Sequence, residues 1–283
     1  MKEEKTKKKA RPKRAYKDSL FTLYFREKPR LLELYNVLSG NTYPLDTSIM
    51  INTIMNVLFF GQYNDLSFLI NGRLIVLFEH QASWNPNMPF RLLLYIVELY
   101  MRMFPDHSTF FSSKLVPIPP VECYVLYNGT DEKLDHSVLK LSDAFHKVEG
   151  ANPMLELEVH VYNVNNGRNP DIMEKAQSLK EYAAFIACVR THLAVGKPLD
   201  KAIEHAIDEC IARNIMSDFL KTHRVEVRNV LFNEVTVEDV IRVRTRDARD
   251  EEAQKWQSVL AEKDIVLAEK DAIIAKLRAQ IGG

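Results

Sequence analysis

Three polar side chains lie at the ends of two expected strands. Asp65 opens the segment DLSFLI (65–70), and Glu79 and Gln81 end the apolar run LIVLFEHQ (74–81). Carboxylates are suitable ligands for a hard cation such as Mg²⁺, which prefers oxygen and keeps several of its waters. If the two strands pair, the sequence predicts a divalent-cation site built by Asp65 and Glu79.

The register of the predicted hairpin decides whether these carboxylates meet. Asn71-Gly72 is a strong hairpin signal. In a hairpin, the residue numbers of two paired residues have a constant sum. A two-residue turn gives a sum of 143, and Asp65 then points away from Glu79. A three-residue loop closed by Gly72 as a bulge gives a sum of 142, so that Asp65 faces Leu77. Glu79 is then the diagonal neighbour, ~7–8 Å away at the backbone, and we expect this bulged register.

The elements that must position this site alternate between helical and extended patterns. Residues 17–39 have apolar side chains at helical spacing, and Pro29 is expected to split them into two helices. The segment 90–104 predicts a strongly apolar helix, and helices dominate from residue 171 onward. The predicted strands are 49–60, 65–70, 73–79, 121–129 and 155–164. This pattern predicts an α/β fold with a small mixed sheet flanked by helices.

The two ends of the chain differ from this core. Residues 1–14 carry eight basic and two acidic side chains, a basic arm that is typical of disordered segments and can bind phosphate. At the other end, Leu260, Leu267, Ile274 and Ile281 repeat every seven residues, which predicts a coiled coil and a dimer. A single amphipathic helix docked on its own domain is the alternative. The candidate DNA-binding residues of the arm are Lys7, Lys8, Lys9, Arg11, Lys13 and Arg14.

Composition excludes several classes of protein. The chain of 283 residues is 46% hydrophobic and 10% aromatic, as expected for a globular protein, and its formal net charge is zero. Three separated cysteines without a C-x-x-C pair argue against a disulfide framework or a zinc site. No apolar run approaches the ~20 residues that span a bilayer, and no secretory signal is found. We therefore expect a cytoplasmic protein without a membrane partner.

Two further groups of polar residues are weaker candidates. Glu156, Glu158 and His160 share one face of an expected strand and could bind a metal, but alternating polar residues are normal on a half-exposed strand. His205 and Cys210 are five positions apart on an expected helix and do not share a face. Ordinary core or surface placement is expected for both groups.

The order of several motifs resembles a known family. The segment VLFEHQASWNPNMPFRLLLY resembles the recombination-promoting nuclease (Rpn) family, also described as putative transposases, within the PD-(D/E)xK nuclease superfamily. The D-x-x-F motif is Asp18 to Phe21, the R-x-x-x-Y motif is Arg91 to Tyr95, and the later blocks are YVLYNG, LKLSDAF and LKEYAAFI. The resemblance runs from about residue 18 to about residue 240.

The resemblance implies a restriction-endonuclease-like core and a role for each site residue. Asp65 and Glu79 would hold Mg²⁺, or Mn²⁺ as a substitute, with the backbone carbonyl of His80 as third ligand. The superfamily lysine is Gln81 here, which would position the attacking water by hydrogen bonding rather than by charge. Glu33 would be an auxiliary acid, and Arg91 would contact phosphate or hold Glu79.

These expectations give four regions and one leading function. The regions are a basic disordered arm (1–16), a nuclease core (17–165), a helical region (166–247) and a coiled-coil tail (248–283). The leading function is a Mg²⁺-dependent DNA endonuclease in recombination, mobile-element biology or defence. The alternatives are a weakly active or inactive nuclease-fold protein that binds DNA or partners through its coiled coil, and a DNA-binding regulator that acts through the arm.

Overall fold

The computed structural model describes residues 19–52, 65–130 and 133–232, together with Trp256 and Lys263. The chain divides into two units, Met1–Phe232 and Asn233–Gly283. In the second unit, Trp256 and Lys263 are both helical. The basic arm and its six candidate DNA-binding residues lie outside the described residues, as does almost all of the predicted coiled-coil tail.

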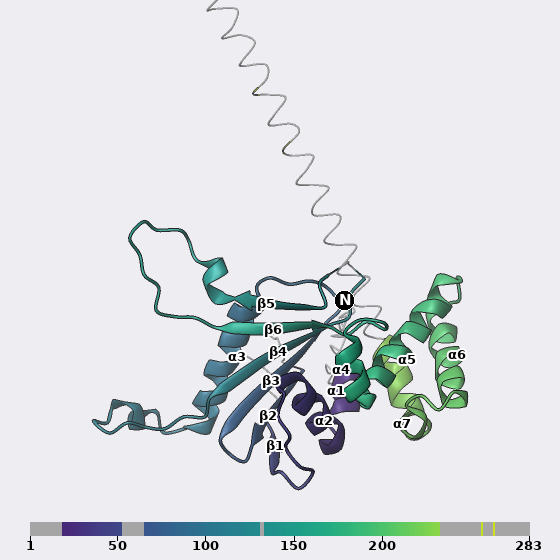
Figure 1. Ribbon diagram of the computed structural model, residues 1–283, viewed down its shortest axis with the longest axis horizontal. Helices are drawn as coiled ribbons and strands as arrows, with labels where there is room; N and C mark the ends of the chain where they lie inside the picture. Colours follow the sequence, from purple (N-terminus) through teal and green to yellow (C-terminus); the bar gives the residue numbers. More distant parts are fainter. Residues whose placement is uncertain (1–18, 53–64, 131–132, 233–255, 257–262, 264–283) are drawn as a thin grey trace, which may run out of the picture. The chain divides into compact units, whose positions relative to one another are not determined.

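The first unit is built on a six-stranded mixed sheet with the strand order β1-β2-β3-β4-β6-β5 (Figure 1). β3 pairs in parallel with β4, and β4 with β6, whereas the β1–β2, β2–β3 and β5–β6 pairs are antiparallel. The strands are β1 (Ile49–Ile51), β2 (Leu66–Ile70), β3 (Leu74–Gln81), β4 (Val121–Tyr127), β5 (His136–Lys140) and β6 (Glu158–Asn163). The expected mixed α/β architecture is confirmed.

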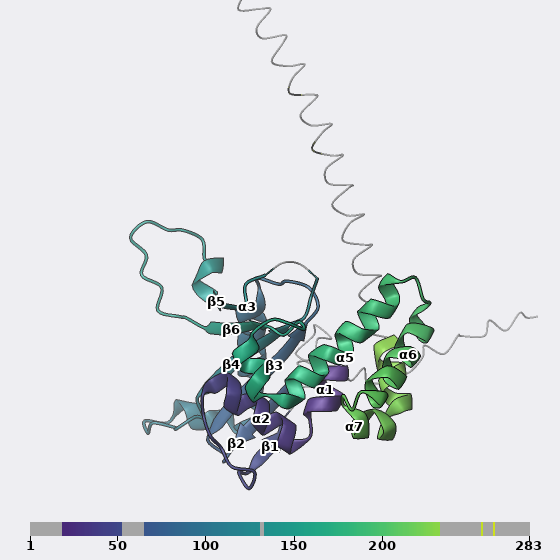
Figure 2. The same cartoon turned by 45° about the vertical axis from the view of Figure 1, so that its right-hand side comes forward.

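Helices cover both faces of this sheet. Figures 1 and 2 show α3 on one face and α1, α2, α4 and α5 on the other. The helices are α1 (Leu20–Phe25), α2 (Lys28–Ser39), α3 (Met88–Met103), α4 (Pro170–Lys175), α5 (Gln177–Ala194), α6 (Leu199–Ala212) and α7 (Ser217–Thr222). Short 3-10 helices are η1 (His107–Phe111) and η2 (Leu141–Ala144).

Alternating side chains of the strands divide the core into two hydrophobic clusters. Phe68 and Phe78 pack with α1, α2 and the helices after β6. Leu69 and Leu77 pack instead with α3. Because successive residues of a strand point to opposite faces, this division fixes which face each residue of β2 and β3 occupies. The helices α4–α7 share their cluster with α1 and α2. Of these, α6 packs against α5 and α7 packs against α6, beside the sheet (Figure 1).

The first two helices begin and end where the sequence indicates. The Ser19 hydroxyl caps α1 by accepting from the Thr22 N–H at 3.0 Å. Pro29 lies in the first turn of α2, where its missing N–H costs no helical hydrogen bond. Gly40 ends α2 in the left-handed conformation with φ of 73°. The predicted division at Pro29 is confirmed.

One predicted strand is shorter in the structure, and one strand of the structure was not predicted. Of the strand expected over residues 49–60, β1 covers Ile49–Ile51, and residues 53–64 lie outside the described part of the chain. The edge strand β5 was not predicted, because it is short and its burial alternates only weakly between exposed and half-buried positions.

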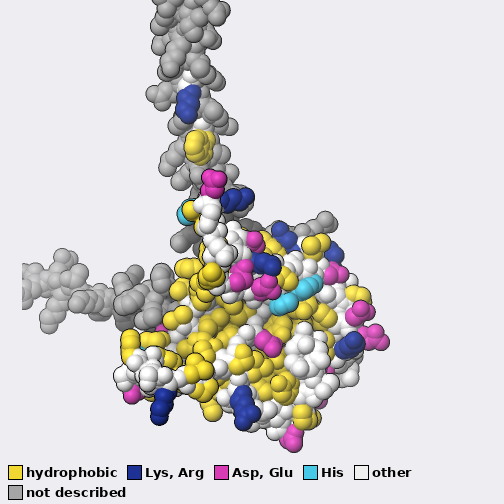
Figure 3. All heavy atoms as spheres, turned by 60° about the vertical axis from the view of Figure 1, so that its left-hand side comes forward, with side chains coloured by type: hydrophobic (Ala, Val, Ile, Leu, Met, Phe, Trp, Pro, Cys, Tyr) yellow, Lys and Arg dark blue, Asp and Glu magenta, His cyan; other side chains and the backbone are white. Residues whose placement is uncertain are grey.

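One face of the molecule is rich in exposed apolar side chains (Figure 3). On α3 and the segment that follows it, the exposed large hydrophobic residues are Phe90, Val97, Met101, Phe110, Phe111, Leu115 and Ile118. Within the described ranges, none of the helices combines the length and apolar character required to cross a membrane.

Candidate active site

The β2–β3 hairpin has a register that differs from both expected ones. Leu66 pairs with Phe78 and Ile70 with Leu74, so partner numbers sum to 144. Asn71 and Gly72 both have positive φ, and the Ile70 carbonyl accepts from the Arg73 N–H at 2.9 Å. Arg73 is therefore an extra loop residue, and the loop has three residues, 71–73, as expected for a bulged hairpin. The predicted register of 142 is wrong because the extra residue follows Gly72 instead of preceding Asn71.

This register brings the two carboxylates closer than predicted. Continued by one residue, it places Asp65 directly opposite Glu79 instead of opposite Leu77. Directly opposed residues have Cβ atoms about 4.5–5.5 Å apart, compared with ~7–8 Å for diagonal neighbours. Asp65 and Glu79 also share the face of the sheet that α3 covers, by alternation from Leu69 and Leu77.

Burial makes both carboxyls harder to ionise, and for Glu79 the nearby Asp65 adds to the effect. Burial raises the pKa of Asp65 to about 6, although the His80 N–H and the Arg91 charge oppose this shift. Glu79 is only 2% exposed, and burial together with the Asp65 charge raises its pKa well above the ordinary value. Glu79 Oε1 is buried without a hydrogen-bond partner among the described residues. Such a pair favours a bound cation, which would remove the cost of two buried negative charges.

Arg91 lies beside this pair on the first turns of α3. Its Nη2 atom lies 3.7 Å from Glu79 Oε2 and donates to the Tyr95 hydroxyl at 3.3 Å. Arg91 and Tyr95 are one helical turn apart, so the R-x-x-x-Y motif places both on one face of α3. Arg91 therefore forms an ion pair with Glu79.

The N-terminus of α1 fixes the position of Asp65. Thr22 Oγ1 donates to the Asp65 carbonyl at 3.0 Å, and the Ser19 hydroxyl hydrogen-bonds the Asp65 carboxylate. The His80 N–H donates to Asp65 Oδ2 at 2.6 Å, which ties the acid to β3. Sequence reasoning did not identify Ser19 or Thr22. Its only signal was a serine at the position before the first apolar helix, where capping residues are common.

The His80 ring lies on the opposite face of the sheet. It stacks on Phe21 with 5.6 Å between ring centroids, and its Nε2 atom is 3.1 Å from the Tyr182 hydroxyl on α5. Burial, assisted by the positive charge of Arg190, lowers the pKa of His80 to about 4, so the ring is neutral at physiological pH. Phe21 belongs to the D-x-x-F motif, of which Asp18 lies outside the described residues.

Gln81 ends β3 on the same face as Glu79, beside the end of β4. It pairs with Tyr127, and its carbonyl accepts from the Asn128 N–H at 2.9 Å. The chain after β4 passes close to the chain after β3. Gly129 allows this close approach, because a Cβ atom there would meet the Ala82 carbonyl oxygen at 2.3 Å. The glycine that ends the sequence YVLYNG is therefore required by the close packing of the two chain segments beside the site.

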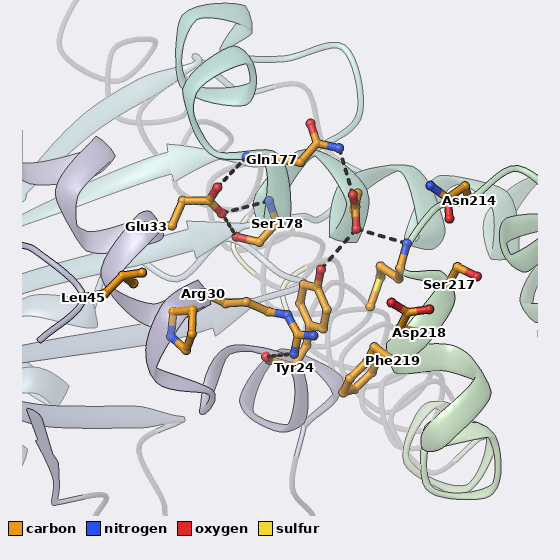
Figure 4. A pocket seen from close by; sticks show the side chains of 13 residues that line it. Tyr24, Arg30, Glu33, Leu45, Gln177, Ser178, Asn214, Ser217, Asp218 and Phe219 are labelled. Atoms are coloured by element: carbon orange, nitrogen blue, oxygen red, sulfur yellow. Dashed lines mark hydrogen bonds between the residues drawn. The ribbon is translucent and has the colours of Figure 1, made fainter.

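Glu33 lies in a different place from the carboxylate pair. Its carboxylate accepts from the N–H groups of Gln177 and Ser178, at 3.2 and 2.9 Å, and from the Ser178 hydroxyl (Figure 4). It thus caps the first turn of α5 and lines a pocket of about 540 Å³ with Tyr24 and Glu181. No contact in the described part of the chain joins it to Asp65 or Glu79.

The donor set of the candidate site fits a hard divalent cation. Asp65 and Glu79 supply carboxylate oxygens at the ends of adjacent strands, and the buried Glu79 Oε1 has no hydrogen-bond partner among the described residues. Gln81 follows on the same face with a carboxamide. These residues can hold a cation and orient a polar ligand.

The fold and the site together define a three-layered mixed α/β protein with two facing carboxylates at the ends of neighbouring strands. A family model described as "Putative transposase, YhgA-like" matches residues 63–206, just over half of the chain. The chain belongs to this family, which confirms the resemblance seen in the motifs. A search of curated proteins and a search of solved structures gave no match. The matched region includes Asp65, Glu79 and Arg91 but neither α1 nor α2.

Proposed function

We propose that the chain is a metal-dependent DNA endonuclease with a PD-(D/E)xK-like core. The observation that carries this proposal is the buried Glu79 directly across the hairpin from Asp65, with one oxygen lacking a partner among the described residues. Membership of a transposase family is consistent with chemistry on DNA. Mg²⁺, or Mn²⁺ as a substitute, would be held by Asp65, Glu79 and the His80 carbonyl.

A bound cation would supply Lewis acidity and an activated water for phosphodiester hydrolysis. The residues of the chain prepare the site for it. The His80 N–H and Ser19 fix the Asp65 carboxylate, and Arg91 offsets part of the charge of Glu79. Gln81 would orient the water by hydrogen bonding. The His80 ring is neutral and bonded to Tyr182 on the other face, so it contributes its backbone to the site.

The remaining expectations are part of the same proposal. The basic arm (1–16) would add phosphate affinity that does not depend on sequence, and the heptads of the tail (248–283) would form a dimer. A dimer would place two sites on one DNA molecule, which suits cleavage of both strands. We propose a cytoplasmic location.

Plasmid nicking in Mg²⁺ tests the proposal. Asp65→Asn and Glu79→Gln preserve side-chain shape and remove charge, so nicking should be lost in both while folding is retained. The matched controls are Asp135→Asn and Glu98→Gln, which alter acids paired with Arg168 and Arg102 at the surface. If all five proteins nick DNA equally, the nuclease proposal fails.

A second candidate is a nuclease-fold protein that binds DNA or protein partners without cutting. The position of Arg91 favours it, because a guanidinium 3.7 Å from Glu79 already supplies a positive partner to one carboxylate. The exposed apolar residues of α3 and the following segment also suit a protein contact. In this case, removing residues 1–16 should abolish DNA binding, and Asp65→Asn should leave it unchanged.

A further inference from the structure

The helices α5 and α6 form a hairpin that brings together metal-ligating side chains from both. Cys188 and His192 are one turn apart on α5, and His205 and Glu209 are one turn apart on α6. Cysteine sulfur, an imidazole nitrogen and a carboxylate oxygen from Cys188, His192 and Glu209 lie within 4.8 Å of one another. The sequence alone paired His205 with Cys210 and rejected that pair, whereas the fold brings Glu209 to the α5 residues.

The atoms of this cluster are close and poorly satisfied. His192 Nε2 lies 3.2 Å from Glu209 Oε2, yet this buried nitrogen makes no well-oriented hydrogen bond among the described residues. Cys188 is buried and contacts both Cys210 and Glu209. In a tetrahedral zinc site with bonds of about 2.0–2.3 Å, neighbouring ligand atoms are roughly 3.3–3.6 Å apart. The nitrogen–oxygen distance is already close to this value.

We propose that Cys188, His192 and Glu209 bind a borderline transition-metal cation, foremost Zn²⁺. The ligand set distinguishes this site from the one at Asp65 and Glu79, because sulfur and imidazole favour Zn²⁺ over Mg²⁺. The ligands would be Cys188 Sγ, His192 Nε2 and Glu209 Oε2, with water at the fourth position. Binding requires the thiol to give up its proton to solvent.

The bound cation would tie the end of α5 to α6. The same helix carries Tyr182, which contacts His80 behind the carboxylate site. The proposed metal would therefore hold α5 and α6 together. It would stabilise the folded chain, because it binds the folded state more tightly than the unfolded state.

Lys197 gives a specific prediction about the ligand atom. Its ammonium lies 3.0 Å from His192 Nδ1, so Nδ1 accepts a hydrogen bond from it and Nε2 carries the ring hydrogen. Coordination through Nε2 moves the ring hydrogen to Nδ1, which then needs an acceptor. Lys197→Gln supplies an amide oxygen and should tighten binding by about tenfold. Equal or weaker binding in this variant would overturn the assignment of Nε2.

Titration of the full chain with Co²⁺, followed by competition with Zn²⁺, tests the site under reducing conditions. Co²⁺ should give a thiolate charge-transfer band and visible bands of a tetrahedral site, and Zn²⁺ should remove them. Cys188→Ser should abolish the charge-transfer band, and Glu209→Gln should weaken binding at least about tenfold. Glu209 has a side chain that is 42% exposed, so this variant is expected to fold.

The controls separate this site from the rest of the protein. Cys123→Ser removes a buried thiol of the sheet, and His107→Gln removes an exposed imidazole; neither should change the titration. Asp65→Asn should leave the charge-transfer band intact, because no sulfur ligand belongs to that site. The absence of a thiolate band in the unmodified chain, or its persistence in Cys188→Ser, would overturn the proposal whatever the nicking assay shows.

Discussion

Replacing Asp65 with asparagine should stabilise the protein when no divalent cation is present. Burial raises the pKa of Asp65 from an ordinary 3.8 to about 6. Ionised Asp65 therefore lowers the free energy of unfolding by about 3 kcal/mol at neutral pH, compared with low pH, because each unit of pKa change is worth about 1.4 kcal/mol. An acid whose pKa rises on folding contributes full stability below its unfolded pKa. That contribution is lost as the pH rises from about 4 through about 6.

Asparagine removes the buried charge and keeps an oxygen that can accept from the His80 N–H. At pH 7.5 in chelator, Asp65→Asn should therefore unfold at a higher temperature than the unmodified chain, by up to roughly 6–12 °C for a domain of this size. At pH 4 the two proteins should unfold at similar temperatures, because Asp65 is protonated there. Added Mg²⁺ should raise the unfolding temperature of the unmodified chain and have little effect on the variant.

Thermal unfolding followed by circular dichroism measures both effects. Asp135→Asn is the control, because this acid pairs with Arg168 at the surface. An Asp65→Asn variant that is no more stable than the unmodified chain at pH 7.5 in chelator would show that ionisation of Asp65 does not destabilise the fold. A stability gain that does not depend on pH would also contradict it, because the gain is assigned to ionisation of Asp65.

Two further changes test the surroundings of the site. Glu33→Gln should cost about 1–2 kcal/mol of stability, because it removes charge from the N-terminus of α5. Plasmid nicking should remain intact, and a loss of nicking with normal unfolding would restore Glu33 as an auxiliary acid. Gly129→Ala should cost about 1–3 kcal/mol, because its Cβ would meet the Ala82 carbonyl oxygen at 2.3 Å. Denaturant unfolding measures this cost, and an unchanged midpoint would show that the strand ends are not tightly packed.

The sequence predicted the hairpin but could not predict its register. Asn71-Gly72 identifies the turn, while the placement of Arg73 in the loop determines which residue faces Asp65. Alternation normally fixes register, because a slip of one residue moves apolar side chains to the wrong face. All five residues of β2 are buried, since helices cover both faces of the sheet. The apolar pattern therefore did not distinguish the faces. In addition, registers of 142 and 144 place every residue of the two strands on the same face, so alternation cannot separate them, and the position of the extra loop residue decides.

Features determined by neighbouring residues in the chain, such as helix ends, were predicted correctly. Pro29 and Gly40 marked the limits of α2, and the apolar run of β3 correctly ended at polar residues. Thr22 on α1, which donates to the Asp65 carbonyl, lies 43 residues earlier in the chain, and Tyr182, the partner of the His80 ring, lies 102 residues after His80. The spacing of residues along the chain does not show which distant residues meet in the fold. These contacts to Asp65 and His80 could therefore not be predicted from the sequence.

Charge balance at the site bears on the two candidate functions. When both carboxyls are ionised, Asp65, Glu79 and Arg91 together carry a net charge of −1. A lysine at position 81 would neutralise this remainder, but Gln81 leaves it in place. Ionised carboxylates in a buried site need further positive charge, because desolvation and mutual repulsion both oppose ionisation. With glutamine at position 81, the ionised site depends more on a bound cation. This supports the proposed metal-dependent nuclease over the second candidate, in which the Arg91–Glu79 ion pair takes the place of the metal.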